Sequence, residues 1–254
     1  MITSSNDRGG KAEDRKVALA TGGTKGIDRG VAMMLLKKGY YVIVTYAHDK
    51  ESAEAFANKA SNVSKSFNVC KIDQTDRLQT YAFIDSLKES GLKLDCIICN
   101  AGITRRSSFT STSNADWDDM MEVAVNSHYI IIRELFHQIN PNSRIVFTAS
   151  TLALYPHASV LGYGVSKSGV VALTKGLMKK FDGTGTTINA VAPGFVDTEW
   201  QKKKPQEIRN NICKKTDLHK FATVDEVVDG YRFCIDNGYV NGSVIEINGG
   251  YSYK

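Results

Sequence analysis

Residues 16–30 read KVALATGGTKGIDRG, and this stretch decides the class of fold. A short apolar run, 16–21, precedes three closely spaced glycines, Gly22, Gly23 and Gly26, and an amphipathic segment follows them. Glycines permit a tight turn and close approach of a ligand, and the first turn of a helix offers unpaired N–H groups to a phosphate. The stretch predicts a strand, a phosphate-binding turn and a helix, although a turn without a ligand can have the same composition.

The same alternation continues along the chain. Short, almost continuously apolar runs alternate with longer amphipathic stretches, as expected for parallel strands covered by helices on both faces. We therefore predict an α/β fold, a doubly wound, seven-stranded parallel sheet of the Rossmann type, with ligands bound beyond the carboxyl ends of the strands. The expected strands are 16–21, 41–46, 67–72, 94–99, 144–150, 187–192 and 243–247, and the expected helices include 27–38, 79–88, 116–138 and 165–181.

Composition indicates one globular domain, 16–254. The chain has 254 residues, of which 42% are hydrophobic and 23% charged, and no apolar run approaches the roughly 20 residues that cross a bilayer. Residues 1–15 are polar, so we expect a mobile lead-in and a cytoplasmic protein. The net charge of +5, without a basic helix or aromatic platform, does not suggest nucleic-acid binding. We expect no metal site either.

Cys96 and Cys99 form a C-x-x-C pair inside an apolar run. Residues three apart in a strand point to opposite faces, whereas a redox or zinc site needs both thiols on one loop or helix start. We expect two buried core thiols.

Small and polar residues follow the expected strands where ligands should bind. Asn100–Thr104 follows 94–99, and Ser150 ends 144–150. Tyr163 and Lys167 lie four apart in an expected helix, so both face the same side. An ammonium near a phenol lowers the pKa of the phenol, which makes it a usable acid or base. A lone Tyr-x-x-x-Lys pair is common on solvated helices, so the pair gains meaning only from its surroundings.

Those surroundings resemble the short-chain dehydrogenase/reductases. Thr21–Asp28, Asn100–Gly102, Asn126, Ser150, Tyr163, Lys167 and PGFVDT (193–198) follow that family's order and spacing. The chain is most similar to the 3-oxoacyl-[acyl-carrier-protein] reductases of fatty acid biosynthesis, through NAGIT, the segment before Asn126 and the ending VNGSVIEINGGY. The resemblance runs from Lys16 to the C-terminus.

The resemblance implies a catalytic group of four residues. Tyr163 would protonate the carbonyl oxygen as a nicotinamide delivers hydride to its carbon, and Ser150 would hold that oxygen. Lys167 would lower the pKa of Tyr163 and bind the nicotinamide ribose. Asn126 would hold a water that relays protons to Lys167, although it could equally plug a helix irregularity.

The resemblance also implies a set of dinucleotide contacts. Pro193 and Gly194 would stiffen the loop along the nicotinamide, Val196 and Thr198 would meet its carboxamide, and Asp73 would lie beside the adenine. The full set is Gly22, Thr24, Lys25, Gly26, Ile27, Thr45, Tyr46, Asp73, Asn100, Ala101, Gly102, Tyr163, Lys167, Pro193, Gly194, Val196 and Thr198.

We predict NADPH rather than NADH. NAD-binding relatives carry an acid at the end of the second strand, where this chain has Thr45 and Tyr46. Lys25 could pair with a 2′-phosphate and His48 could assist, while the nearby Asp49 leaves NADH open.

Asp28 stands where a third glycine is expected. A negative charge 4–8 Å from a phosphate costs about 2–4 kcal/mol at an effective dielectric of 20. An aspartate in the first turn of a helix instead contributes about 0.3–1 kcal/mol of stability. Beside Arg29 in solvent the carboxylate would do little harm, whereas along the loop it would weaken cofactor binding. We expect a site that still binds.

We predict NADPH-dependent reduction of a 3-oxoacyl thioester. Arg105, Arg106 and the lysines of 201–215 could form a basic rim that attracts an acidic acyl carrier protein or coenzyme A, or could be a solvated surface. Residues 199–217 should form a mobile cover over the substrate. Other small ketones, such as a sugar or a steroid, and a dinucleotide-binding protein without turnover stay open. By resemblance we expect a homotetramer.

Overall fold

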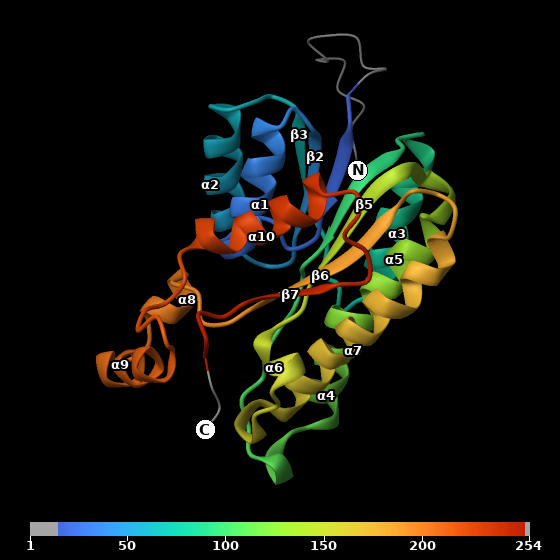
Figure 1. Ribbon diagram of the computed structural model, residues 1–254. Coiled ribbons are helices and arrows are strands. Elements are labelled where there is room, and N and C mark those ends of the chain that lie inside the picture. The colour runs from blue at the N-terminus through green and yellow to red at the C-terminus, as the bar shows by residue number, and fades with distance from the viewer. Residues whose placement is uncertain (1–14, 252–254) are drawn as a thin grey trace.

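The computed structural model describes residues 15–251, so most of the expected lead-in, residues 1–14, and residues 252–254 lie outside the described part. Seven parallel strands form one sheet in the order β3-β2-β1-β4-β5-β6-β7 (Figure 1). The strands are β1 (Val17–Ala20), β2 (Tyr41–Tyr46), β3 (Phe67–Lys71), β4 (Leu94–Cys99), β5 (Ile139–Thr148), β6 (Thr187–Pro193) and β7 (Val244–Ile247). The fold confirms the predicted doubly wound parallel sheet.

Helices cover both faces of this sheet (Figure 1). One layer contains α1 (Gly26–Lys37), α2 (Lys50–Ser61) and α10 (Val224–Asp236), and its apolar core includes Leu35, Phe56 and Tyr231. The other contains α3 (Arg77–Glu89), α4 (Asn114–Met121), α5 (Ser127–Glu134) and α7 (Leu161–Met178), around Ile84, Ile131 and Phe147. The shorter helices are α6 (Thr151–Leu154), α8 (Glu199–Lys202) and α9 (Gln206–Lys215).

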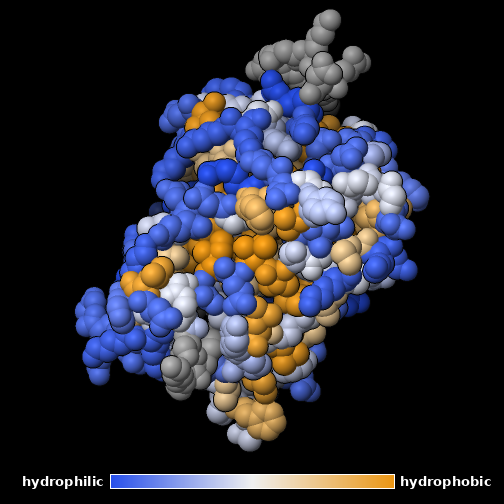
Figure 2. Space-filling view, in the orientation of Figure 1, coloured by the Kyte–Doolittle hydropathy of each residue, from blue (hydrophilic) through white to orange (hydrophobic). Residues whose placement is uncertain are grey.

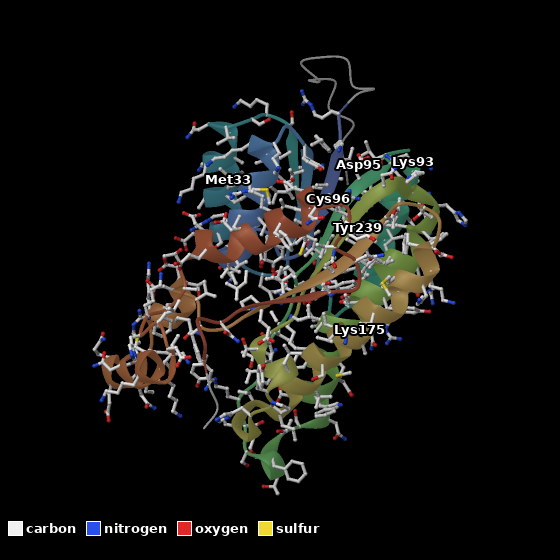
Figure 3. All side chains as sticks on the ribbon, viewed as in Figure 1. Met33, Lys93, Asp95, Cys96, Lys175 and Tyr239 are labelled. Atoms are coloured by element: carbon white, nitrogen blue, oxygen red, sulfur yellow. The ribbon has the colours of Figure 1, made fainter. Side chains whose placement is uncertain are left out.

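The two cysteines of the C-x-x-C pair belong to different layers. Cys96 lies in the core beneath α1 and α10, and Cys99 in the core beneath α3, α5 and α7. Figure 3 labels Cys96 within the sheet. Burial raises the pKa of the Cys96 thiol to about 12 and that of Cys99 still further from its usual value. The expectation of core thiols is confirmed.

Two predicted elements differ from the structure. The expected helix 116–138 is divided into α4, a π-helical turn Glu122–Asn126, α5 and a 3₁₀ turn Phe136–Gln138. Strand β5 begins at Ile139 rather than 144, and its pairing with β4 shifts register between Leu94 and Cys96. The sequence did not predict this early start because residues 140–143 are polar and include Pro141. The segment is irregular: Asn142 has a positive φ of 61°, and Ser143 donates a hydrogen bond to the Leu94 carbonyl at 2.9 Å.

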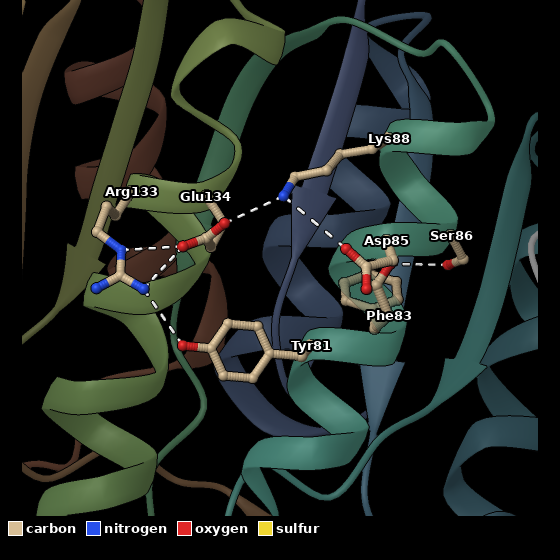
Figure 4. A network of polar contacts seen from close by, with 7 residues as sticks. All are labelled: Tyr81, Phe83, Asp85, Ser86, Lys88, Arg133 and Glu134. Atoms are coloured by element: carbon tan, nitrogen blue, oxygen red, sulfur yellow. Dashed lines mark hydrogen bonds and ion pairs between the residues drawn. The ribbon is translucent and has the colours of Figure 1, made fainter.

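An ionic network joins α3 to α5 on the outside of their layer (Figure 4). Lys88 lies 3.1 Å from Glu134, and Arg133 lies 2.7 Å from the same carboxylate and 3.2 Å from the Tyr81 hydroxyl. Exposed pairs of this kind contribute little individually, about 0–1 kcal/mol each. The network therefore orients two helices that the apolar core already holds.

The opposite layer depends on a close approach of α1 to α10 at Gly30. A Cβ atom at Gly30 would lie 2.7 Å from Cγ2 of Val228 and 2.8 Å from Cγ1 of Val224, whereas one at Gly176 in α7 would meet nothing within 4 Å. This contact sets the distance between the glycine turn and the helix that closes the layer.

Gly30→Ala should therefore destabilise the protein by about 1–3 kcal/mol, because α1 and α10 must separate. The matched control, Gly176→Ala, should stabilise it by up to about 1 kcal/mol through helix propensity. Urea unfolding followed by circular dichroism measures both. Equal shifts in the two variants would contradict the role given to this contact.

Candidate active site

The carboxyl ends of β1 and β4 are joined through the hydroxyl of Thr21. Its Oγ1 accepts hydrogen bonds from the backbone N–H groups of Asn100 at 3.0 Å and Ala101 at 3.1 Å. It also lies 3.0 Å from Nε2 of His128, and both side chains are buried. Thr21 thus holds the loop Asn100–Gly102, which the resemblance placed beside the cofactor.

The hydrogen bonds of His128 define its tautomer. Nδ1 lies 2.9 Å from the Ala124 carbonyl oxygen, which can only accept, so Nδ1 carries the proton. Nε2 then accepts from the Thr21 hydroxyl. Burial lowers the pKa of His128 to about 3, with Lys167 adding to the effect, so the ring is neutral. Sequence reasoning missed His128 because a histidine in an apolar helix carries no distinctive pattern.

The glycine turn presents bare backbone to the crevice. Gly22 and Gly26 have positive φ values of 72° and 59°, and a Cβ at Gly22 would lie 3.2 Å from Cα of Ala101. Between these glycines Thr24 is buried, and Ile27 in the first turn of α1 is half-buried. A turn without room for side chains fits close approach of a dinucleotide phosphate.

Thr45 supports this turn from below. Its hydroxyl accepts from the Gly22 N–H at 3.1 Å, its carbonyl accepts from Gly23 at 3.0 Å, and its side chain is buried. The side chain of Thr45 therefore faces the glycine turn, and its expected contact with a cofactor stays a prediction. Tyr46, the next residue, is half-buried at the end of β2.

Ser150, Tyr163 and Lys167 converge beyond β5. Ser150 begins α6, where its Oγ accepts from the Leu152 N–H at 3.2 Å, and it is hydrogen-bonded to the Tyr163 hydroxyl. Tyr163 and Lys167 share one face of α7, and the Lys167 Nζ lies 5.8 Å from the Tyr163 ring centre. That ammonium donates to the Thr148 carbonyl at 2.7 Å and is buried.

The electrostatics of this group differ from the expectation. Burial raises the pKa of Tyr163, and the hydrogen bond to Ser150 only partly offsets the rise. Burial also lowers the pKa of Lys167 to about 8, although the Asp28 carboxylate acts in the opposite direction. Lys167 does not contribute to the pKa shift of Tyr163, so the predicted lowering of that pKa is not seen here.

Asn126 ends the π-helical turn and is half-buried. Its amide donates to Glu122 at 2.8 Å, and Glu122 pairs with Arg77 at 2.7 Å. Asn126 thus bonds within the helix irregularity, as in the second role considered from the sequence. The water relay through Asn126 stays a prediction.

Asp28 points along the loop rather than into solvent. Its carboxylate is hydrogen-bonded to the Asn100 side chain and interacts with Lys167 and Lys25. The residue is half-buried, and desolvation raises the pKa of its carboxyl well above the usual value, against the effects of Lys167, Asn100 and Lys25. Of the two orientations open from the sequence, the structure contains the one that faces the cofactor loop.

Two basic side chains near the ends of β2 and β3 each lie beside a carboxylate. Lys25 lies 3.0 Å from Asp49, and His48 lies 3.1 Å from Asp73. Asp49 also begins α2 by accepting from the Ser52 N–H at 2.9 Å, which together with Lys25 lowers its pKa to about 2. Any 2′-phosphate bound by Lys25 or His48 must compete with these carboxylates.

The loop after β6 borders the other end of the crevice. The Pro193 carbonyl accepts from the Thr151 hydroxyl at 3.0 Å, and Gly194 donates to Ile247 at 2.9 Å. Val196 is buried and bridges to Ala222. The methyl group of Thr198 would touch a Cβ at Gly26 at 3.4 Å, so the two loops meet across the crevice.

The segment 199–217 contains the helices α8 and α9, and its expected role as a mobile cover over the substrate stays a prediction. Arg209 pairs with Asp197 at 2.9 Å and stacks on the Phe221 ring at 4.3 Å. The side-chain oxygen of Gln201 is buried and accepts no hydrogen bond from the residues that the structure describes. Arg105 lies 3.2 Å from Asp116 and 3.7 Å from Asp119, so acidic residues neutralise part of the expected basic rim.

Comparisons with known proteins agree with this geometry. The family model described as short chain dehydrogenase matches residues 16–209. A 2-dehydro-3-deoxy-D-gluconate 5-dehydrogenase from Pseudoalteromonas atlantica is 29% identical, over 93% of this chain and 95% of its own. A 3-oxoacyl-[acyl-carrier-protein] reductase from Staphylococcus aureus is 27% identical, over 92% and 97%. A Burkholderia cenocepacia short chain dehydrogenase solved with NADP superposes with a TM-score of 0.86 at 26% identity, over 93% and 97%.

The neutral His128 makes stability depend on pH. An unfolded histidine binds a proton below a pKa of about 6.5, whereas His128 in the folded protein does so only near 3. Its contribution is therefore present above pH 6.5 and is lost as the pH falls towards 3, by about 2 kcal/mol at pH 5.

His128→Gln should lower the free energy of unfolding at pH 7 and flatten its decline between pH 6.5 and 4. His137→Gln, which changes an exposed histidine, is the control and should keep the wild-type slope. Denaturant unfolding at several pH values gives both curves. A wild-type slope in His128→Gln would refute the assignment.

Proposed function

Because this chain belongs to the short-chain dehydrogenase family, we propose that it is an NADPH-dependent reductase of a 3-oxoacyl thioester carried by acyl carrier protein or coenzyme A. The observation that carries the proposal is the convergence of Ser150, Tyr163 and Lys167 at the crevice beyond β5. The reductase from Staphylococcus aureus, similar over nearly its whole length, supports the substrate class.

The proposed chemistry follows from the positions of these side chains. When bound, the reduced nicotinamide supplies a hydride to the substrate carbon. The Tyr163 hydroxyl gives its proton to the carbonyl oxygen, and Ser150, already hydrogen-bonded to that hydroxyl, holds the same oxygen. Lys167 lies beneath Gly102, where a Cβ would be only 3.1 Å from its Nζ, so a ribose could reach the ammonium over bare backbone. There the ammonium favours the phenolate that proton transfer leaves on Tyr163.

NADPH is the proposed cofactor. Thr45 and Tyr46 leave no acid at the end of β2, and Lys25 is positioned at the turn. The Burkholderia cenocepacia structure contains NADP, which supports a nicotinamide dinucleotide in this fold.

A second substrate class has similar support. The Pseudoalteromonas atlantica dehydrogenase named for a deoxygluconate is as similar as the thioester reductase. Burial lowers the pKa of Lys204, and the positive charge of Arg106 adds to this effect. Both a sugar-acid carboxylate and the phosphates of a thioester carrier are anions that such cations attract.

We also propose self-association through the edge of the sheet. Strand β7 ends the strand order, and its Val244, Ile245 and Ile247 are only half-buried. Figure 2 shows a hydrophobic area on this face, over the region of β6 and β7. From the family resemblance we propose that the assembly is a homotetramer. In such an assembly a neighbouring chain would cover the exposed edge of β7.

Tyr163→Phe should lower kcat for NADPH-dependent reduction by at least about 1,000-fold, because the proton donor is lost while the ring is kept. Acetoacetyl-coenzyme A, 2-dehydro-3-deoxy-D-gluconate in the oxidative direction and a neutral ketone are the substrates to compare. Turnover by Tyr163→Phe at the wild-type rate would contradict the role of Tyr163 as proton donor.

A higher kcat/KM for acetoacetyl-coenzyme A supports the thioester reductase, and a higher value for the sugar acid replaces it with the second class. Tyr155→Phe, a neighbouring exposed tyrosine, is the control and should keep at least half of the activity.

Light scattering coupled to size-exclusion chromatography should give about four times the chain mass of 27.9 kDa. A mass of one chain at micromolar concentration would contradict the proposed assembly.

A further inference from the structure

The π-helical turn Glu122–Asn126 is reinforced by side chains at its end. Three consecutive side chains each bond to the residue four positions earlier: Asn126 to the Glu122 carboxylate at 2.8 Å, Ser127 to the Val123 carbonyl at 2.8 Å and His128 to the Ala124 carbonyl at 2.9 Å. Turns of this kind are rare and occur frequently at functional sites. Of the three side chains, Asn126 is the one to which the family resemblance gives a part in the reaction.

Two residues of the segment after β3 hold this turn from outside. The Gln74 amide donates to the Ser127 hydroxyl at 2.7 Å, and both side chains are buried. Arg77, the first residue of α3, donates to the Glu122 carboxylate from Nε and from Nη2, each at 2.7 Å. Gln74 therefore anchors the end of the turn, whereas Arg77 reaches Asn126 through one carboxylate.

The contact between Arg77 and Glu122 differs from an ordinary surface ion pair. The Glu122 side chain is only 13% exposed and accepts from Asn126 as well as from Arg77. The hydrogen bond with Arg77 lowers the pKa of Glu122, so the carboxylate is ionised at neutral pH. A planar guanidinium with two bonds to one carboxylate also fixes the plane of that carboxylate. The orientation of the group that holds Asn126 is therefore set by Arg77.

The Asn126 amide has a defined orientation in this arrangement. An ionised carboxylate only accepts hydrogen bonds, so the amide nitrogen of Asn126 faces Glu122. The amide oxygen accepts no hydrogen bond from the residues that the structure describes, so it is open to a water. Loss of the Glu122 contact would leave this amide free to turn.

We propose that Arg77, acting through Glu122, is a positioning residue that fixes the Asn126 amide for proton transfer. This inference rests on the proposed function, in which the proton that Tyr163 gives to the substrate is replaced from solvent through a water on Asn126 and through Lys167. Arg77 then affects the rate of the reaction although it touches neither the substrate nor the cofactor.

The test compares Arg77→Gln with Lys88→Gln in the full chain, using whichever of the three substrates named above the wild type turns over fastest. Arg77→Gln should lower kcat by about 10- to 100-fold, because a small misplacement of a group in the site costs up to about 100-fold. The KM for the substrate and the Kd for NADPH should stay within twofold. The solvent deuterium isotope effect on kcat should increase, because proton transfer becomes slower than the other steps.

Lys88 is the matched control. It also lies on α3 and pairs with a carboxylate across the helical layer, Glu134 at 3.1 Å, and its other ion pair is with Asp85 (Figure 4). Both pairs lie outside the π-helical turn. Lys88→Gln should therefore keep kcat, KM and the isotope effect within twofold of the wild type. Urea unfolding followed by circular dichroism checks that each variant is folded.

A double-mutant cycle shows whether Arg77 acts through Asn126. Asn126→Ala should lower kcat at least as much as Arg77→Gln does. In the Asn126→Ala background, Arg77→Gln should then change kcat less than twofold, because the amide that it positions is absent. A contribution of Arg77 to stability alone would not produce this dependence.

An unchanged kcat in Arg77→Gln would overturn the inference and leave the proposed function standing. The same follows if Lys88→Gln loses as much activity, or if Arg77→Gln lowers kcat equally with and without the Asn126 amide. A wild-type chain that reduces none of the three substrates would instead refute the proposed function, and the inference with it.

Discussion

The hydroxyl of Thr21 is the interaction on which the crevice depends. One oxygen accepts from two consecutive N–H groups of the β4 loop and donates to a neutral histidine in α5. Because that histidine is in turn bound to the π-helical turn, strands β1 and β4 and the helix across from them share one set of hydrogen bonds. A buried network of this kind specifies its geometry only while every member is satisfied. The placement of Asn100, and through it of Asp28, follows from this junction.

Desolvation governs the charges around that junction. The crevice encloses an ammonium, a carboxylate and two phenols, and burial shifts each of them towards its neutral form. Lys167 and Asp28 oppose this trend for one another, so neither titrates independently of its partner. Asp28 therefore adds to the raised pKa of Tyr163, so the unusual residue of the glycine turn acts on the proposed catalytic acid.

Much of the architecture was predictable because burial on both faces gives apolar runs, and β2 and β4 match their predicted limits. Helix spacing predicted that Tyr163 and Lys167 share one face, and the family resemblance implied that Ser150 joins them. The interruption at Glu122–Asn126 could not, because it depends on side chains of Ser127 and His128 that bond back to carbonyls four residues earlier. The orientation of Asp28 was equally hidden, since it is decided by Asn100, a residue distant in sequence.

The two thiols of β4 have a consequence for how the protein opens. Cys96 and Cys99 are three residues apart on one strand, yet each is sealed by a different helical layer. A fluctuation that lifts α1 and α10 uncovers the first, and one that lifts α3, α5 and α7 uncovers the second. Their modification rates would therefore record the two local unfolding equilibria separately. Strand β4 thus contains one thiol probe of local opening for each helical layer.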